Sequence, residues 1–387
     1  MDAGGAFDDE TTARTLETAD AIVDRFLPLE DQRRRDADRD PPYALLRELG
    51  EAGLLALAVP AADGGLGAPW TLVSAVQERL GERAWMLASL YNRCVGFGAA
   101  SLTSYASAAQ RAEWLPRLMR GEGLFALALT EDGAGSDAAA VRCRAERVAD
   151  GWRLTGRKVW ISDAAEADAM VVAARSDPDS KRGAGISLFL VPKGVAGISF
   201  RSIEKIGNHA LPSFEVTFDG ARLAPDALMG AEGNGFAHLA STLHVARAGM
   251  AASVTGYAEF ALGMAVEHAR ARRQFGRALG EFQALAHRLA DLRMRVDLSR
   301  LAARDLAERI AAGAPCARQA AQAKVIATET LQAVTAEGMQ ILASAGYHAD
   351  SDMARAWRDA RLYSFGEGSN EIQRDIIARE MGLGGRR

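Results

Sequence analysis

The sequence is poor in cysteine and carries no excess of positive charge. It has 387 residues but only three cysteines, Cys94, Cys143 and Cys316, which lie far apart and form no CxxC pair. Scattered thiols of odd number indicate neither a disulfide framework nor a zinc site, and they are typical of a protein in the reducing cytoplasm. The formal net charge of -4 offers no basic surface of the kind that drives nucleic-acid binding. We therefore expect a cytoplasmic protein with no nucleic-acid partner and no metal.

Long apolar runs and several familiar enzyme motifs are also missing. No stretch reaches the roughly 18 uninterrupted apolar residues that read as a membrane-spanning helix. The acidic start MDAGGAFDDETT lacks the basic residues and apolar run of a signal peptide. GxxxxGK[ST], HExxH and GxSxG do not occur, so ATP chemistry, zinc hydrolysis and serine hydrolysis lose their usual sequence support. We expect a soluble protein without a membrane partner.

What the sequence does contain is a change of apolar spacing along the chain. Residues 1–123 have apolar residues at helical spacing, which predicts an N-terminal α-helical domain. Residues 124–229 change to a period of two, clearest at Phe214 to Phe218, and predict a run of antiparallel strands in a β-barrel-like domain. Residues 230–387 return to four long helical segments, which predict a C-terminal four-helix bundle. The predicted fold class is α+β, mainly α.

Two segments of the middle part combine hydroxyl groups with glycines or an aromatic ring. In and just after residues 127–137, LALTEDGAGSD, the residues Gly133, Gly135 and Ala138 match the dinucleotide fingerprint GxGxxG/A, but a strand pattern follows instead of the helix that a pyrophosphate needs. A structural turn and a loop that contacts a polar cofactor edge, with Thr130 and Ser136 as donors, both remain open. Trp160 beside Ser162 fits either the wall of a flat ring or an ordinary half-buried strand.

A third segment, Arg272 to Gly276 with the sequence RRQFG, lies between two predicted helices. Paired arginines at a helix boundary fit a solvated face. They also fit a fork onto phosphate oxygens, with Phe275 stacking on a base.

The fourth segment surrounds Glu367, which lies between Gly366 and Gly368. The two glycines favour a sharp turn at a helix break, and Ser369 is a candidate N-cap for the helix that follows. The alternative is a capped surface helix with exposed acids.

Together, in this order and on this layout of helices, strands and helices, the four segments resemble the acyl-CoA dehydrogenase family along nearly the whole chain. The family patterns LTExxxGSD, WI[ST], RxQFG with a later FQ, and EG[ST]xEIQR correspond to residues 129–137, 160–162, 272–276 with 282–283, and 367–374. The resemblance implies FAD held between the β domain and the C-terminal bundle, in a homotetramer or dimer with FAD sites at subunit interfaces. It also implies an acyl-thioester substrate and an electron-transfer flavoprotein as partner.

The resemblance further implies roles for single residues. Glu367 would be the general base, since the other position that family members use, just before Arg247, is Ala246 here. The Ser162 hydroxyl would lie near the reactive flavin nitrogen N5, and Arg272, Phe275 and Gln283 would reach the FAD of a neighbouring subunit. The implied substrate contacts are Ser136, His244, Arg247 and Gly368. The implied FAD contacts are Leu129, Thr130, Gly135, Ser136, Trp160, Ile161, Ser162, Arg272, Phe275, Gln283, Gln340, Ser369 and Glu371.

Four positions depart from the family pattern. In the segment QxxGGxGY, which begins at Gln340, Ala343 and Ser344 replace the two glycines. His244 stands where an acid commonly helps to hold the thioester arm, and Gly366 replaces a frequent aromatic residue before the base. These departures leave the acyl group open, as well as the choice between CoA and acyl carrier protein.

The predicted reaction is FAD-dependent α,β-dehydrogenation of an acyl thioester to the trans-2-enoyl thioester, with flavin N5 as hydride acceptor. A thioester α proton is too weakly acidic for a carboxylate in water, so its removal needs a desolvated base with a raised pKa. The alternatives are an enoyl-thioester reductase, a flavin oxidase or monooxygenase on the same fold, and a non-catalytic flavoprotein scaffold.

Overall fold

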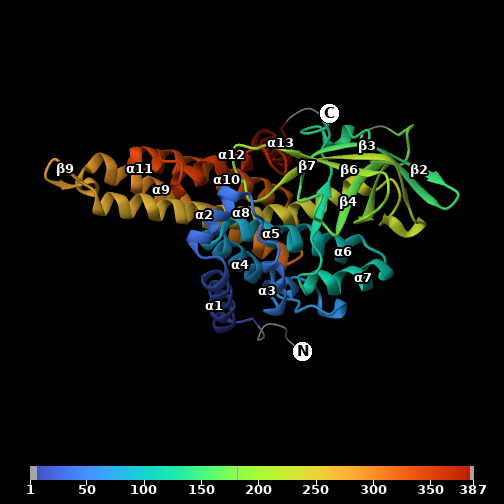
Figure 1. The fold of residues 1–387 in the computed structure, drawn as a ribbon, viewed down its shortest axis with the longest axis horizontal. Coiled ribbons are helices and arrows are strands. Elements are labelled where there is room, and N and C mark those ends of the chain that lie inside the picture. The colour runs from blue at the N-terminus through green and yellow to red at the C-terminus, as the bar shows by residue number, and fades with distance from the viewer. Residues whose placement is uncertain (1–6, 181, 384–387) are drawn as a thin grey trace.

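The computed structural model describes residues 7–180 and 182–383. Half of the acidic start that we analysed for a signal peptide, residues 1–6, lies outside the described residues. Figure 1 shows the N-terminal helices beside a β domain on the right, and long C-terminal helices that extend to the left. The predicted fold class, mainly helical with a central β domain, is confirmed.

Side-chain caps mark the starts of two of the N-terminal helices, α1 and α7. Ser107 and Gln110 form a reciprocal capping box at one start, and Asp8 accepts a hydrogen bond from the Thr11 N–H at another. A π-helix over Arg93–Ala99 interrupts the series, a feature that is frequent near functional sites. The α-helices are α1 (Asp9–Phe26), α2 (Leu29–Asp38), α3 (Leu45–Glu51), α4 (Trp70–Arg83), α5 (Trp85–Asn92), α6 (Ala100–Tyr105) and α7 (Ala108–Met119).

The β domain is one sheet with the strand order β6-β7-β3-β2-β4-β5-β8, and β1 pairs with β4. Its strands are β1 (Phe125–Ala128), β2 (Arg144–Val148), β3 (Gly151–Ser162), β4 (Ala169–Arg175), β5 (Ile186–Pro192), β6 (Ile198–Ile203), β7 (Ser213–Leu223) and β8 (Leu228–Met229). A tight hairpin turn joins β2 to β3, because Val148 pairs with Gly151. The expectation of purely antiparallel strands is wrong, since β1 runs parallel to β4. The chain leaves β1, forms the β2–β3 hairpin and returns in its original direction, which a parallel pair requires.

The C-terminal part consists of α8 (Gly235–Ala271), α9 (Gln283–Ala311), α10 (Ala317–Leu342), α11 (Ser344–Tyr347), α12 (Asp352–Tyr363) and α13 (Asn370–Glu380). The helix α8 has 37 residues and therefore spans about 55 Å. Many of its buried residues are alanine or glycine, which lets other helices approach it closely. Between α8 and α9 the short strands β9 (Arg273–Gln274) and β10 (Arg277–Ala278) form a hairpin that the sequence did not predict. This hairpin lies at the far left end in Figure 1.

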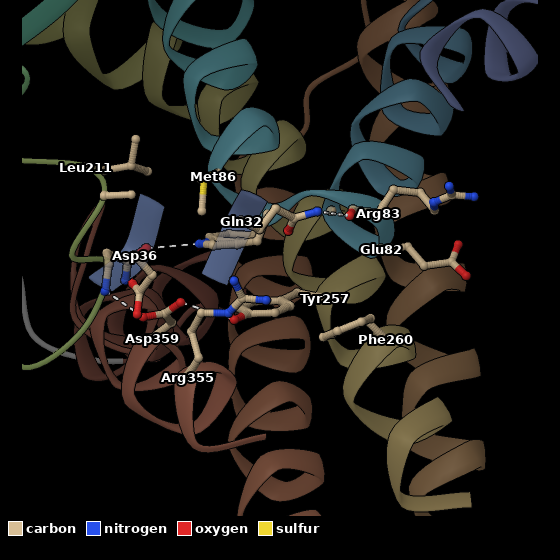
Figure 2. A pocket seen from close by; sticks show the side chains of 14 residues that line it. Gln32, Asp36, Glu82, Arg83, Met86, Leu211, Tyr257, Phe260, Arg355 and Asp359 are labelled. Atoms are coloured by element: carbon tan, nitrogen blue, oxygen red, sulfur yellow. Dashed lines mark hydrogen bonds between the residues drawn. The ribbon is translucent and has the colours of Figure 1, made fainter. Parts of the chain in front are cut away.

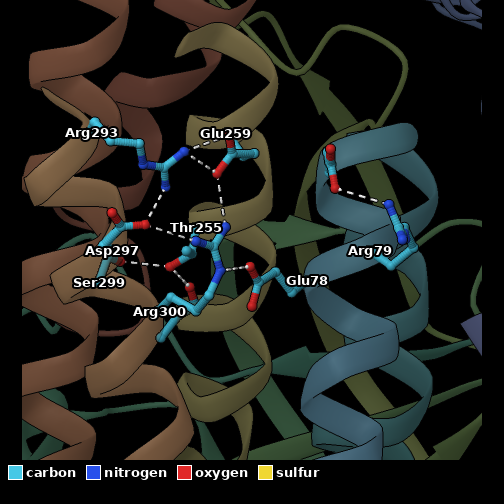
Figure 3. Close-up of polar contacts among 10 residues, drawn as sticks. Glu78, Arg79, Thr255, Glu259, Arg293, Asp297, Ser299 and Arg300 are labelled. Atoms are coloured by element: carbon cyan, nitrogen blue, oxygen red, sulfur yellow. Dashed lines mark hydrogen bonds and ion pairs between the residues drawn. The ribbon is translucent and has the colours of Figure 1, made fainter. Parts of the chain in front are cut away.

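Ion pairs join the N-terminal helices to the bundle. Arg300 of α9 binds Glu78 of α4 at 2.5 Å and Glu259 of α8 at 2.8 Å. Arg293 also binds Glu259, at 2.7 Å, so that two arginines share one carboxylate (Figure 3). Because these pairs are only partly exposed and form a network, they fix the relative position of three helices better than isolated surface pairs do.

Backbone strain at the end of α10 gives a first prediction. Ala343, which stands where the family pattern has glycine, has φ 52° and ψ -129°, a region that suits glycine and costs other residues about 1–3 kcal/mol. We predict that Ala343→Gly raises the free energy of unfolding by about 1 kcal/mol, after the entropy cost of glycine in the unfolded chain. Urea unfolding checks this value. Ala345→Gly, inside α11, is the matched control and should lower stability; a loss in both variants would contradict the prediction.

Candidate active site

Glu367 lies in the break between α12 and α13, where the chain turns sharply. Its φ is 54° and that of Gly368 is 90°, so both residues adopt the left-handed conformation. The hydroxyl of Ser369 accepts a hydrogen bond from the Ile372 N–H at 3.4 Å, which makes Ser369 the N-cap of α13. The glutamate therefore projects from a helix break, as its glycine neighbours predicted.

Side chains from two helices hold this strained turn. Arg247 of α8 donates from Nε and Nη2 to the backbone carbonyl of Glu367 at 3.2 and 3.0 Å. Gln373 donates from Nε2 to the Gly368 carbonyl at 3.2 Å. A Cβ atom at position 368 would lie 2.7 Å from Nε2 of Gln373, so a larger residue would displace this amide, and its φ would be strained.

The carboxyl group of Glu367 is desolvated and incompletely bonded. The residue as a whole is half-buried, but its Oε2 atom is buried and has no hydrogen-bond partner among the described residues. Burial raises the pKa of Glu367 to about 7, against the opposing effect of the positive charges of Arg247, Lys324 and Arg93. A carboxyl group with a free oxygen and a pKa near neutrality is suited to accept a proton.

The alternative position for a base carries no carboxylate and is tightly packed. Ala246 is fully buried, and its carbonyl accepts a hydrogen bond from Nδ2 of Asn92 at 3.2 Å. A Cβ atom at Gly96 would lie only 3.2 Å from Cα of Ala246. The backbones of the π-helix and α8 therefore pack directly against each other at this point.

Trp160 is presented to solvent by an irregularity in β3. The register against β7 shifts between Lys158 and Ile161, and Trp160 between them has φ 61° and is 56% exposed. Bulges of this kind re-aim a side chain. Ile161 is buried and Ser162 half-buried. The exposed ring fits the wall of a flat ligand better than the alternative of an ordinary half-buried strand.

The loop after β1 has an open, polar backbone. Thr130 is half-buried, Gly135 and Ser136 are exposed, and a Cβ atom at Gly133 or Gly135 would meet nothing within 4 Å. Leu129 is half-buried at the start of this loop. The loop therefore leaves space for the edge of a bound molecule.

A buried ion pair that the sequence analysis missed holds this loop to β3. Glu131 accepts hydrogen bonds from the N–H groups of Arg142 and Cys143 at 2.7 and 2.9 Å, and from Nζ of Lys158 at 2.7 Å. Lys158 also donates to the Leu129 carbonyl at 2.9 Å. Burial lowers the pKa of Lys158, and Glu131 opposes that effect. No local signal marks this pair, because Glu131 stands beside Asp132 and Lys158 beside Arg157, and such charged neighbours are typical of the surface.

A second missed group joins three parts of the chain beside Ser162. Asp163 is fully buried, accepts a hydrogen bond from the Tyr43 hydroxyl at 2.7 Å, and forms an ion pair with Arg93 of the π-helix. Its pKa is raised by burial, while Arg93 and the Tyr43 hydroxyl lower it. The charge of Arg93 also lowers the pKa of Glu367, so this pair is near enough to the candidate base to influence it.

Several expected site residues lie elsewhere in the same chain. Arg272 and Phe275 are on the distal β9–β10 hairpin and Gln283 begins α9, at the opposite end of the molecule from β3 (Figure 1). Phe275 has φ 51° and is 94% exposed. One chain therefore does not bring these residues to Trp160 or Glu367.

The other expected residues are distributed around the helices. His244 is half-buried on α8, about one turn before Arg247, and burial lowers its pKa. Gln340 is exposed near the end of α10, and Glu371 is exposed in the first turn of α13. The structure does not give these three residues a shared contact with Glu367.

A small pocket at the junction of α2, α4 and α12 does not compete as the active site (Figure 2). Its polar groups bind one another: Asp359 accepts from the Asn208 N–H at 2.5 Å and from the Tyr257 hydroxyl at 3.1 Å. The Tyr363 hydroxyl and Nε1 of Trp85 donate to the Asn208 side chain. These bonds fix α12, whose end leads into the Glu367 turn.

Within the described ranges 7–180 and 182–383, no cluster of His, Cys, Asp and Glu has the arrangement of a metal site. A search of the same residues finds no helix with the length and apolar character to cross a membrane.

The Glu131–Lys158 pair gives a second prediction. Lys158→Met should lower the free energy of unfolding by about 3 kcal/mol, because it leaves the Glu131 charge buried without its cation. Urea unfolding at pH 7 measures the change. Arg157→Met is the matched control on the adjacent, exposed residue, where ion pairs contribute little. Equal, small losses in both variants would show that the buried pair does not hold the loop.

Comparison with known proteins covers nearly the whole chain. The family models for the N-terminal, middle and C-terminal domains of acyl-CoA dehydrogenase match residues 9–122, 126–221 and 233–382. The mitochondrial short-chain specific acyl-CoA dehydrogenase of Bos taurus is 33% identical, over 89% of this chain and 83% of that protein. An acyl-CoA dehydrogenase of Bacillus subtilis is also 33% identical, over 89% of this chain and 90% of its own.

A solved structure is similarly close in shape. Butyryl-CoA dehydrogenase from Megasphaera elsdenii superposes with a TM-score of 0.92 at 29% identity, covering 96% of this chain and 98% of that one. These matches extend over all three parts of the fold, so the chain belongs to the acyl-CoA dehydrogenase family of oxidoreductases, with FAD as cofactor.

Proposed function

We propose that the protein dehydrogenates an acyl thioester between Cα and Cβ to give the trans-2-enoyl thioester, with Glu367 as the general base. The observation that carries the proposal is the buried, unpartnered Oε2 atom of a carboxyl group whose pKa burial raises to about 7. When bound, FAD supplies the acceptor for the hydride that leaves Cβ. A non-catalytic scaffold would have no need for such a carboxyl group.

The residues around the base determine how it works. Burial destabilises the charged form of Glu367 and raises its pKa, so the carboxylate gains more free energy when it accepts the α proton than an exposed carboxylate would. Arg247 acts on the backbone carbonyl of Glu367 and not on its carboxyl group. It can therefore fix the turn while leaving Oε2 free for the substrate. The backbone N–H of Glu367 is our candidate donor to the thioester oxygen.

The residues present fit FAD at the β domain. Trp160 offers an exposed ring on a bulge, Ser162 a half-buried hydroxyl beside it, and the loop at Gly135 an unobstructed backbone. We assign flavin and phosphate contacts to these residues together with Leu129, Thr130, Ser136 and Ile161, and we assign Ser369 and Glu371 to the residues that would hold the cofactor from the C-terminal part. Trp160 would position the flavin and exclude water from one of its faces.

Short acyl-CoAs are the first substrates to test, because the bovine relative is named for short chains and the Megasphaera elsdenii protein for butyryl-CoA. We assign Ser136, His244, Arg247 and Gly368 to the substrate side, with Arg247 acting through the Glu367 backbone. Because His244 replaces a common acid, an acyl carrier protein thioester belongs in the same panel as CoA thioesters.

The residues at the far end of the bundle support an oligomer in which neighbouring subunits share FAD sites. Arg272, Phe275 and Gln283 lie far from Trp160 in their own chain, and Phe275 is almost fully exposed. We propose a homotetramer or dimer in which these residues, with Gln340, contact the FAD of a neighbouring subunit. An electron-transfer flavoprotein is the proposed electron acceptor, and the cytoplasm is the proposed location.

Glu367→Gln is the direct test of the base. It should lower the rate of anaerobic flavin reduction by acyl-CoAs by at least about 10²–10⁴-fold while FAD binding survives, because only proton removal is lost. In the parent protein this rate should rise as the pH increases through about 7, since the deprotonated carboxylate is the active form. Stopped-flow absorbance at a series of pH values measures both effects.

The control for this test is Asp375→Asn, which removes a partly exposed carboxylate on α13 and should leave reduction unchanged. Undiminished reduction in Glu367→Gln would rule out Glu367 as the base, and failure of every thioester to bleach the flavin would count against the reaction itself.

Phe275→Ser tests the shared cofactor site. Loss of the exposed ring should raise the dissociation constant for FAD about threefold to tenfold, the value of one aromatic stacking contact. Titration of apoprotein with FAD, followed by fluorescence, measures the constant. Phe200→Ser, on β6 in the β domain, is the control and should leave it unchanged. An unaltered constant in Phe275→Ser would argue against a contact between the hairpin and FAD.

A further inference from the structure

Lys324 is a buried cation that the reaction proposed above does not use. Its side chain is 0% exposed on α10, and among residues 7–180 and 182–383 no carboxylate lies within ion-pair distance of it. It donates instead to the Ser364 carbonyl at 3.1 Å and to Oδ1 of Asn370 at 2.8 Å. Burying an ammonium group without a counter-ion is costly, so its position needs a reason.

The two acceptors are the two ends of the Glu367 loop. Ser364 follows the last residue of α12 directly, and Asn370 is the first residue of α13. Asn370 is held from the same helix as Lys324, because its amide accepts from the Thr328 hydroxyl at 3.2 Å. One ammonium group therefore bridges the break that contains the glutamate.

We propose that Lys324 is a positioning residue that holds both ends of the Glu367 loop and provides positive charge that favours the ionised form of this carboxyl group. The inference deepens the function proposed above and rests on Glu367 acting as the base there. Lys324 itself touches neither substrate nor the reacting atoms. It acts through the position and the charge state of Glu367.

The charges around the two groups support this role. Glu367 faces Arg247 on α8, Lys324 on α10 and Arg93 on the π-helix, and all three lower its pKa. Lys324 faces Glu367, Glu371 and Glu329, which raise its pKa, and Arg247, which lowers it. Burial is the largest effect and lowers the pKa of Lys324 to about 8, so the ammonium group is still charged at pH 7.

Removal of the positive charge of Lys324 should raise the pKa of Glu367. Without Lys324, burial acts on Glu367 with less opposition, and the pKa of Glu367 rises further above its ordinary value. More of the base is then protonated at pH 7 and unable to accept a proton. Arg247 cannot take over the loop ends, because it binds the Glu367 carbonyl in the middle of the turn.

The experiment compares Lys324→Met and Lys324→Gln with the parent protein, each with FAD bound. Infrared titration follows protonation of the Glu367 carboxyl group independently of catalysis. Subtraction of the spectra of Glu367→Gln isolates the signal of this one group. We expect the midpoint to move up by about one pH unit in both variants. The rate of flavin reduction at pH 7 should fall about fivefold, because the deprotonated fraction falls from about one half to about one tenth, and it should recover as the pH is raised.

Two further variants separate charge from packing. Asn370→Ala removes one acceptor but keeps the ammonium group, so it should lower thermal stability without the upward move of the Glu367 midpoint. Thr335→Val removes a buried hydroxyl on α10 that binds only within its own helix, and it controls for loss of stability in general.

An unchanged Glu367 midpoint in Lys324→Gln would overturn the proposal, and so would the same shift in Thr335→Val. If Lys324→Met fails to fold, Lys324→Gln, which keeps a hydrogen-bond donor, decides the outcome. The proposed function fails separately, if Glu367→Gln still reduces the flavin, because the infrared titration reports on the carboxyl group whether or not it is the base.

Discussion

The candidate site depends on the two hydrogen bonds from Arg247 to the backbone carbonyl of Glu367. A glutamate with φ near +54° is strained, and it persists only when its surroundings fix it. Arg247 satisfies the carbonyl of this turn from the middle of α8, the helix that also packs against the N-terminal part and the rest of the bundle. The turn is thus tied to the most central element of the fold, and the burial that raises the pKa of Glu367 follows from that attachment.

The cations around Glu367 differ in what they bind, and this difference keeps its carboxyl group unpaired. Arg247 binds a backbone carbonyl, Arg93 binds Asp163, and Lys324 binds the two ends of the loop. Each charge reaches the carboxyl group at a distance without forming an ion pair with it. A direct ion pair would lower the pKa of Glu367 strongly and occupy its oxygens, whereas distant charges moderate the effect of burial and leave Oε2 available.

Sequence patterns predicted the fold class, the turn at Glu367 and the Ser369 cap, because these depend on local spacing and on glycine and serine at fixed positions. They did not predict the parallel pairing of β1 with β4, since periodicity carries no information on partners distant in the chain. The two-residue strands of the β9–β10 hairpin were too short to show a period. The Glu131–Lys158 pair was missed because a single charge in a strand resembles a solvent-facing residue until its partner is known.

The close contact between α8 and the π-helix ties together two of the cations that act on Glu367. A Cβ atom at Gly96 would lie 3.2 Å from Cα of Ala246, and Nδ2 of Asn92 binds the Ala246 carbonyl at 3.2 Å. Arg247 follows Ala246 in α8, and Arg93 follows Asn92 at the start of the π-helix. A larger residue at position 96 would force the two helices apart and move Arg93 relative to Arg247. A substitution remote from any ligand would thereby alter the balance of charge at the base.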